Sequence, residues 1–142
     1  MSKKKSLPLE IIERWLKDPD WRVRSAAMKQ YKNRGLPIPV IRTFEPPDRV
    51  YKKCVNSVIV VAEIPKDAQV RGSFGKKCRA NKAKIVEVIG TYAGVPVGIS
   101  IWDKTTTYFV GDEIEVEDFD YSDEVCSTGY HFFCTREEAE NY

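Results

Sequence analysis

The segment SVIVVAEIP, residues 57–65, sets the architecture of the chain because apolar side chains occupy both of its faces. In an extended chain, Val58 and Val60 fall on one face, and Ile59 and Val61 fall on the other. That pattern is typical of a central strand that is covered on both sides. The sequence therefore predicts a β-sheet in which this segment is a central strand.

Further short strands are expected on its carboxyl side. Their sequences are rich in β-branched and aromatic residues or alternate between apolar and polar; they are KIVEVIG (84–90), VPVGISIW (95–102), TTTYFV (105–110) and EIEVE (113–117). Turn residues at 90–94 and 111–112 favour antiparallel hairpins. No helix-length segment separates the strands, so a parallel, doubly wound sheet is not expected. Residues 48–142 are thus predicted to form a mostly antiparallel α+β domain.

The chain closes on CSTGYHFFCTREEAENY, residues 126–142. Residues 130–134 are predicted to form a strand, in which His131 and Phe133 project to the face opposite Tyr130, Phe132 and Cys134. Thr135 and Glu138 form the spacing of a capping box, which predicts a final helix over residues 136–142.

An internal repeat predicts helices near the amino end. LPLEIIER (7–14) aligns with LPIPVIRT (36–43), and each copy places a proline at a first helical position. Between the copies, Asp20 is expected to cap a helix that ends before Gly35. Residues 8–44 are therefore predicted as helix, turn, helix, turn and short helix.

The run from Asp18 to Met28, DPDWRVRSAAM, resembles HEAT-like helical repeats. Such repeats bury one face against a neighbouring repeat, and this chain holds only a partial array. The two prolines of FEPPDRV (44–50) end the helical pattern. The sequence thus predicts a helical cap over 1–47 and the α+β domain over 48–142. The cap either docks on the following domain or presents a recognition surface of Trp15, Trp21, Arg22 and Arg24.

Composition places few limits on function. The chain has 142 residues, 42% of them hydrophobic, and a formal net charge of +2, which does not demand a nucleic-acid or membrane partner. MSKKKSLPLE has no apolar run behind its lysines, so neither a signal peptide nor a membrane anchor is expected. We expect a cytoplasmic protein whose four cysteines stay reduced.

His131 is the only histidine, and three roles are open to it. A zinc site would need Cys78, Cys126 and Cys134 to converge with it on one ion, but strand alternation directs His131 and Cys134 apart. A nucleophile pair with Cys126 would need an orienting acid and an oxyanion site, and no motif supplies them. The favoured interpretation is a packed ring whose nitrogens bond to backbone, with neither metal nor cofactor.

Residues 50–142 resemble an uncharacterised domain that follows pentapeptide or HEAT-like repeats in bacterial and phage proteins. The resemblance is carried by KCRANKA (77–83), which matches K-C-R-x-x-K-A, and by GYHFFCTREEA (129–139), which matches G-I-H-F-F-x-T-x-x-E-A with Tyr130 in place of isoleucine. It implies a domain boundary and a phage or mobile-element setting, with no assigned chemistry.

GYHFFCTREEA is also similar to a segment of ADP-ribosyltransferase-like folds. That resemblance implies Tyr51 and His131 as site residues of an enzyme that uses NAD. Those enzymes carry a glutamate on a later strand, and this sequence offers only Glu63 or Glu87 in its place.

Charge is segregated into two blocks. Residues 71–84 carry bases without acids, and residues 112–124 carry acids without bases. The blocks either face each other, lie in solvent, or bind a partner. The basic block, with Phe74 between its cations, makes nucleic acid an alternative partner.

Together these patterns favour a non-enzymatic interaction module that binds a partner protein, as an inhibitor or adaptor. The expected contact residues are Trp21, Arg22, Arg24, Lys76, Lys77, Arg79, Lys82, Asp118 and Asp120.

Overall fold

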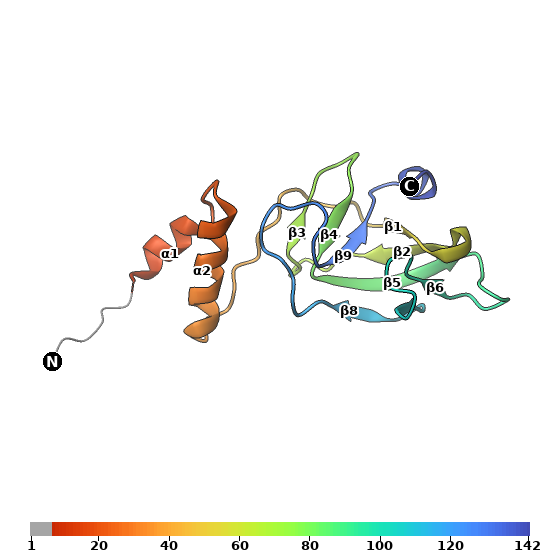
Figure 1. Ribbon diagram of the computed structural model, residues 1–142, viewed down its shortest axis with the longest axis horizontal. Coiled ribbons are helices and arrows are strands. Elements are labelled where there is room, and N and C mark those ends of the chain that lie inside the picture. Colours follow the sequence, from red (N-terminus) through yellow and green to blue (C-terminus); the bar gives the residue numbers. More distant parts are fainter. Residues whose placement is uncertain (1–6) are drawn as a thin grey trace. The chain divides into compact units, whose positions relative to one another are not determined.

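The computed structural model describes residues 7–142 (Figure 1). Two compact units are present: the first runs to Pro39 and includes residues 121–123, and the second comprises residues 40–120 and 124–142. The boundary predicted at residues 47 and 48 stays a prediction.

The first unit contains two helices, α1 (Leu9–Trp15) and α2 (Trp21–Asn33). Both begin as predicted, α1 directly after Pro8 and α2 after Asp20, whose carboxylate accepts a hydrogen bond from the N–H of Arg22 at 2.9 Å. The helices pack through apolar side chains that are buried between them; these are Ile12, Leu16, Ala27, Met28 and Tyr31.

The short helix predicted over the second repeat copy is wrong. Residues 36–44 contain no helix, and Arg42 instead forms a parallel bridge with Val70. Pro39 stands where the first copy has Glu10, and a proline disfavours helical backbone at the residue before it. The extended segment forms backbone hydrogen bonds with β3 instead. The Thr43 N–H donates to the Val70 carbonyl oxygen, and the Val70 N–H donates to the Ile41 carbonyl oxygen, each at 3.1 Å.

The second unit is an α+β fold, as predicted, and all its strand pairs are antiparallel. Its strands are β1 (Val50–Lys53), β2 (Ile59–Glu63), β3 (Val70–Arg71), β4 (Cys78–Ala80), β5 (Lys82–Ile89), β6 (Gly98–Ile99), β7 (Thr107–Tyr108), β8 (Glu113–Glu115) and β9 (Tyr130–Phe132). A single helical turn (Val55–Ser57) joins β1 to β2, and helix α3 (Arg136–Glu140) follows β9.

The strand ladders close on themselves. One sheet has the order β1-β2-β5-β8 and another the order β3-β4-β9. Tyr51 and Phe133 join β1 to β9 through two backbone hydrogen bonds of 2.8 and 2.7 Å. Only Asn81 separates β4 from β5, so these two strands form one long bent strand. The circuit β5-β2-β1-β9-β4 thus surrounds an apolar core, and Figure 1 shows β1, β2 and β5 side by side within it.

The central position predicted for residues 57–65 is confirmed. β2 pairs with β1 on one side and β5 on the other, and residues 59–62 are all buried. Its neighbours contribute Val50 and Ile85 to the same core.

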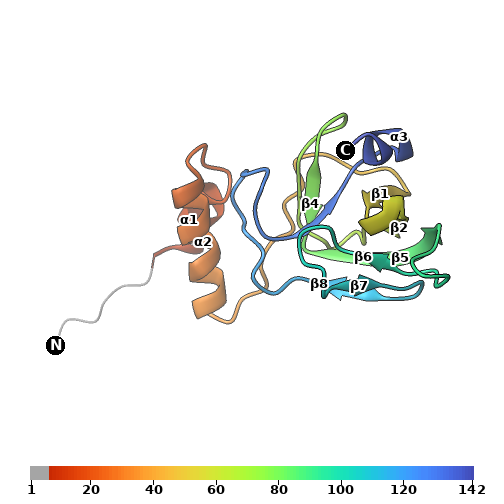
Figure 2. The same ribbon diagram turned by 45° about the vertical axis from the view of Figure 1, so that its right-hand side comes forward.

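The turn predicted at residues 90–94 is present, because Tyr92 and Val95 exchange backbone hydrogen bonds of 2.8 and 2.9 Å. The strands on either side of it do not pair, and neither do β7 and β8 around residues 111–112, so the two hairpins expected there are wrong. β5 already has β2 and β8 as its two partners, so the strand after Gly90 cannot join it. That strand, β6, pairs instead with β7 in a separate small hairpin (Figure 2). Within the predicted strand of residues 95–102, Val97 is buried while Val95 and Ile101 are exposed.

The closing motif folds as its pattern predicts. Burial alternates along residues 130–134, with His131 and Phe133 on the less buried face. Thr135 caps α3 by accepting from the Glu138 N–H at 3.2 Å, and its hydroxyl donates to the Glu138 carboxylate at 2.8 Å. The final helix ends at Glu140, two residues before its predicted end.

Candidate functional site

Arg79 of the basic segment is a buried side chain. It is 1% exposed, and its guanidinium donates to the carbonyl oxygens of Glu124, Asp120 and Thr128 at 2.7, 2.5 and 3.0 Å. Its guanidinium carbon also lies 4.7 Å from the centre of the Phe119 ring. These contacts hold the loop that precedes β9, which is a structural role for this cation.

The other cations of residues 71–84 are mostly engaged as well. Arg71 is 3% exposed and donates to the carbonyl oxygen of Ile41 at 2.7 Å. Lys82 forms an ion pair with Asp67 at 2.8 Å and lies opposite Glu115 in the β5–β8 ladder, where Lys84 lies opposite Glu113. The basic and acidic blocks therefore meet along this ladder, where opposite charges on adjacent strands stabilise the pairing.

The acidic contact candidates lie on the loop before β9. Asp118 is exposed, and its carbonyl oxygen accepts from the Thr128 hydroxyl at 2.6 Å. The Asp120 carboxylate accepts from the Ser127 hydroxyl at 2.6 Å.

The candidates of the first unit lie on α2. Trp21 is 50% exposed, and Arg22 forms an exposed ion pair with Asp20 at 3.0 Å. Arg24 donates to the carbonyl oxygens of Asp18 and Pro19 and pairs with Asp123 at 3.0 Å. Trp21 is the member of this set with the most apolar surface available for a contact.

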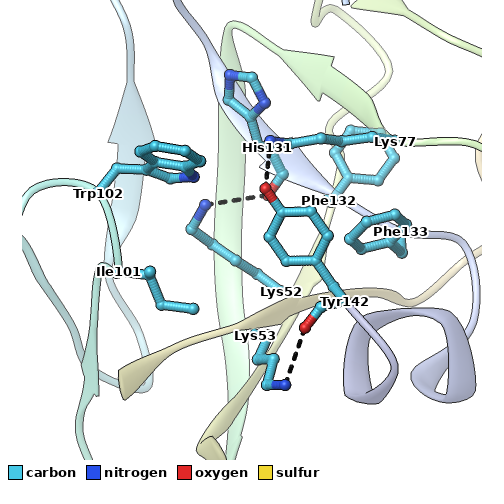
Figure 3. Close-up of a pocket in the computed structure, with 9 residues that line it drawn as sticks. All are labelled: Lys52, Lys53, Lys77, Ile101, Trp102, His131, Phe132, Phe133 and Tyr142. Atoms are coloured by element: carbon cyan, nitrogen blue, oxygen red, sulfur yellow. Dashed lines mark hydrogen bonds between the residues drawn. The ribbon is translucent and has the colours of Figure 1, made fainter. Parts of the chain in front are cut away.

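A pocket lies beside β1 and β9 in the second unit. Two adjoining hollows share Lys52, Lys77, Trp102 and His131, and the larger has a volume of about 430 Å³. We call the pair of hollows the lysine pocket. Figure 3 shows these side chains around the smaller hollow, with the ammonium groups of Lys52 and Lys77 entering it from different sides.

Lys52 comes from β1 and reaches across two aromatic rings. Its Nζ lies 5.4 Å from the centre of the Tyr130 ring and 6.0 Å from that of Tyr108. It donates one long hydrogen bond, 3.4 Å, to the carbonyl oxygen of His131 (Figure 3). Burial, together with the nearby charge of Lys77, lowers the pKa of Lys52 to about 8.

Lys77 lies between two exposed rings. Its Nζ donates to the Tyr142 hydroxyl at 3.0 Å, 4.9 Å from the centre of that ring, and lies 5.6 Å from the Trp102 ring. Trp102 is 77% exposed, so it offers a broad apolar face at the rim. Within residues 7–142, neither Lys52 nor Lys77 forms an ion pair.

The larger hollow contains one carboxylate, that of Asp103. Both of its oxygens accept hydrogen bonds, from the Thr105 N–H and hydroxyl at 3.0 and 2.6 Å and from the Thr106 hydroxyl at 2.7 Å. These bonds lower the pKa of Asp103 to about 2. Asp103 therefore fixes its own loop, and the two ammonium groups remain available in the pocket.

His131 lines the pocket but is anchored to backbone. Its Nε2 lies 2.6 Å from the carbonyl oxygen of Ser127, so Nε2 carries the proton and donates it. Burial lowers the pKa of His131 to about 4, which keeps the ring neutral. The prediction that the ring nitrogens bond to backbone is thus confirmed for Nε2 and wrong for Nδ1, which is buried and has no hydrogen-bond partner among the described residues.

The residues of the enzyme interpretation do not come together. Tyr51 pairs with Phe133 through its backbone, and its side chain lines neither hollow. Glu63 pairs with Arg49 at 3.1 Å, and Glu87 is exposed on β5; neither lines the lysine pocket.

The cysteines do not gather around His131. Cys54, Cys78 and Cys134 are buried, and burial raises the pKa of the Cys78 thiol to about 12. Cys126 is exposed at the rim of the larger hollow. Among residues 7–142, no group of three or more potential ligands could hold a metal ion.

The sequence patterns indicated Lys77 and His131 as candidate site residues. They did not indicate Lys52 or Trp102, which lie beside them in the pocket. The four residues come from β1, the loop before β4, the loop after β6, and β9. No motif spans them, and only the closed circuit of strands brings them together.

Comparisons with known proteins give one match. A family model described as a family of unknown function (DUF5758) matches residues 38–139. No curated protein and no solved structure matches the chain. Within the part of the chain that the structure describes, none of the helices is long and apolar enough to cross a membrane.

Proposed function

Because this chain belongs to the DUF5758 family of unknown function, we propose a role from its own residues: a non-enzymatic interaction module that binds an acidic segment of a partner protein in the lysine pocket. The observation that carries this proposal is the pair of ammonium groups, Lys52 and Lys77, that share one pocket without an ion-pair partner among residues 7–142. A carboxylate placed between them would gain two charge-assisted hydrogen bonds.

The rim favours a protein as the source of that carboxylate. Trp102 is 77% exposed and Ile101 is 37% exposed, and both line the pocket beside the lysines. Exposed aromatic side chains next to a cation are typical anchors of protein interfaces. An acidic residue flanked by apolar ones would therefore match both the charge and the apolar surface.

A nucleic-acid role through residues 71–84 has weaker support. Arg71 and Arg79 are buried, and Lys82 is paired with Asp67. Backbone phosphates need a row of accessible cations, and only Lys76, Lys77 and Lys84 remain, the last of them opposite Glu113 in the β5–β8 ladder.

The ADP-ribosyltransferase-like alternative also lacks a supporting arrangement. Tyr51 lies outside the lysine pocket, and the carboxylate inside it, Asp103, is held by Thr105 and Thr106. The ADP-ribosyltransferase-like enzyme stays an alternative that rests on the sequence resemblance, and we propose no transfer chemistry from it.

We also propose a location and an origin for the protein. We propose a cytoplasmic location, supported by four cysteines that are free in the structure. The phage or mobile-element origin, the partial HEAT-like repeat and the role as inhibitor or adaptor are proposals that rest on the sequence resemblance. Partner contacts by Trp21 and Arg22 on α2 belong to the same set of proposals.

A titration with defined probes tests the function. Variants with Trp15→Phe and Trp21→Phe leave Trp102 as the fluorescent tryptophan. The probe is an N-acetylated hexa-aspartate amide, and a single-stranded oligonucleotide of equal charge is the comparison. We expect the peptide to change Trp102 fluorescence with a dissociation constant of about 1 mM. Lys77→Gln should weaken binding about tenfold, while the exposed neighbour Lys76→Gln changes it less than about twofold.

Three results would contradict the proposal. They are no fluorescence change with the peptide, equal effects of Lys76→Gln and Lys77→Gln, or tighter binding of the oligonucleotide. The third would favour the nucleic-acid alternative.

A further inference from the structure

We infer that Lys52 is a nucleophilic lysine, and that the lysine pocket condenses it with the carbonyl group of a small aldehyde or α-keto carboxylate. This inference goes beyond the proposed binding of an acidic segment and does not require it. It assigns a stoichiometric covalent site, one ligand per chain, rather than turnover.

The geometry around Lys52 leaves its amine accessible but poorly solvated. Its Nζ is flanked by the faces of Tyr130 and Tyr108 and has one long bond to a carbonyl oxygen. Both hollows are lined by Lys52, and Figure 3 shows its nitrogen pointing into the space between Trp102 and Tyr142. The Lys52 amine can therefore contact a ligand in the pocket while it stays beside the Tyr108 and Tyr130 rings.

The charged and titratable groups around Lys52 favour its neutral form. Lys77, in the loop before β4, lowers the pKa of Lys52 through its positive charge, whereas Cys54, which directly follows β1, raises it. Tyr108, Tyr130 and His131 remain neutral near pH 8, because burial raises the pKa of both phenols and lowers that of the imidazole. The Asp103 carboxylate is occupied by Thr105 and Thr106. A desolvated lysine beside another cation is the arrangement that activates amines for imine formation.

The step is a simple condensation. The lone pair of the neutral Lys52 amine attacks the carbonyl carbon and forms a C–N bond. The carbonyl oxygen then leaves as water and takes both amine hydrogens, so that a C=N double bond remains. No oxidant or reductant takes part, and the reverse reaction with water restores the free lysine.

Lys77 selects a ligand that also carries a carboxylate. Its ammonium lies in the same pocket without an ion pair among the described residues, and its charge would hold the carboxylate of an α-keto acid while the carbonyl carbon meets Lys52. A volume of about 430 Å³ admits such small molecules readily.

Reductive trapping tests the site on the full chain. The protein is treated with sodium glyoxylate and sodium cyanoborohydride at pH 8, and labelling of each lysine is followed by peptide mass spectrometry. We expect Lys52 to be labelled about tenfold faster than the exposed Lys104, because a larger fraction of it is neutral at that pH. Lys77→Gln should slow labelling of Lys52 by glyoxylate more than labelling by propanal, because propanal has no carboxylate for Lys77 to hold and loses only the activation that the charge of Lys77 provides.

A urea control distinguishes activation by the folded pocket from the ordinary reactivity of a lysine side chain. In urea the advantage of Lys52 over Lys104 should disappear, because it depends on the folded pocket. If Lys52 in the folded protein is labelled no faster than Lys104, the inference is overturned. Retained trapping with no peptide binding would contradict only the proposed function, and peptide binding without preferential trapping would contradict only this inference.

Discussion

The ammonium of Lys52 lies over the face of Tyr130, 5.4 Å from the ring centre. Tyr130 is 2% exposed, and its hydroxyl has no hydrogen-bond partner among the described residues, so the ring serves as an apolar wall with a negative π face. The ring face attracts the Lys52 ammonium through a cation–π contact, and it carries no negative charge that would form an ion pair. That relationship explains how the pocket keeps an unpaired ammonium, and it supports the proposed binding of a carboxylate.

Arg79 should be essential for folding. We expect Arg79→Met to lower the free energy of unfolding by about 3 kcal/mol, because three carbonyl oxygens lose a charged donor in a buried setting. Urea unfolding of the variant measures the loss, with Lys76→Gln as the exposed control that should change stability by less than about 0.5 kcal/mol. A folded Arg79→Met protein of unchanged stability that had lost partner binding would show Arg79 to be a contact residue.

His131 should make stability depend on pH. Its pKa is about 4 in the folded chain and near 6.5 when unfolded, so the unfolded state binds the extra proton between these values. The contribution is fully present above pH 6.5 and is lost as the pH falls toward 4. We expect wild type to exceed His131→Gln in melting temperature at pH 7, with a difference that shrinks at pH 4.5.

The same variant tests whether His131 has a chemical role. Gln can still donate to the Ser127 carbonyl, so peptide binding measured well below the melting temperature should be retained. A melting curve identical to wild type at every pH, together with complete loss of binding, would assign His131 to the ligand site rather than to the fold.

Gly98 should be required for close packing of β6. A Cβ on Gly98 would lie 2.3 Å from Cγ2 of Val60 and 3.0 Å from the Cys54 sulfur. We expect Gly98→Ala to cost about 2 kcal/mol through overpacking, and Val60→Ala in the same chain should recover part of that loss. Gly94→Ala meets no atom within 4 Å but has a φ of +80°, so it should cost about 1 kcal/mol from backbone strain alone. Additive effects of Gly98→Ala and Val60→Ala in urea unfolding would contradict the steric argument.

The sequence correctly predicted the elements that depend on neighbouring residues, namely the central strand and the starts of two helices. The doubly apolar pattern of residues 59–62 marks the centre of the main sheet, and Asp20 and Thr135 cap helices where their spacing predicts. The second repeat copy misled because its first proline favours a helix start, while Pro39 prevents the helix and Val70 offers an extended partner. Strands β1 and β4 were missed as elements, because their lysine and arginine side chains obscure the apolar alternation.

The pocket itself could not be read from the sequence. Arg79 looks like an exposed cation in a basic run, and its burial depends on carbonyl groups more than 40 residues away, such as that of Asp120. Lys52 likewise looks like one of two adjacent surface lysines. Its partial burial follows from Tyr108 and Tyr130, which meet edge to face with ring centres 5.7 Å apart only once β7 and β9 are in place.

An NMR titration of the full chain with the hexa-aspartate amide shows where on the protein an acidic segment binds. We expect the Trp102 indole N–H and the backbone amides of Lys52, Lys77 and His131 to shift together and saturate with one dissociation constant, while the amide of the exposed Lys76 does not move. Saturable shifts confined to α2 or to residues 73–76, with the Trp102 indole unchanged, would place the binding surface elsewhere and contradict the central claim.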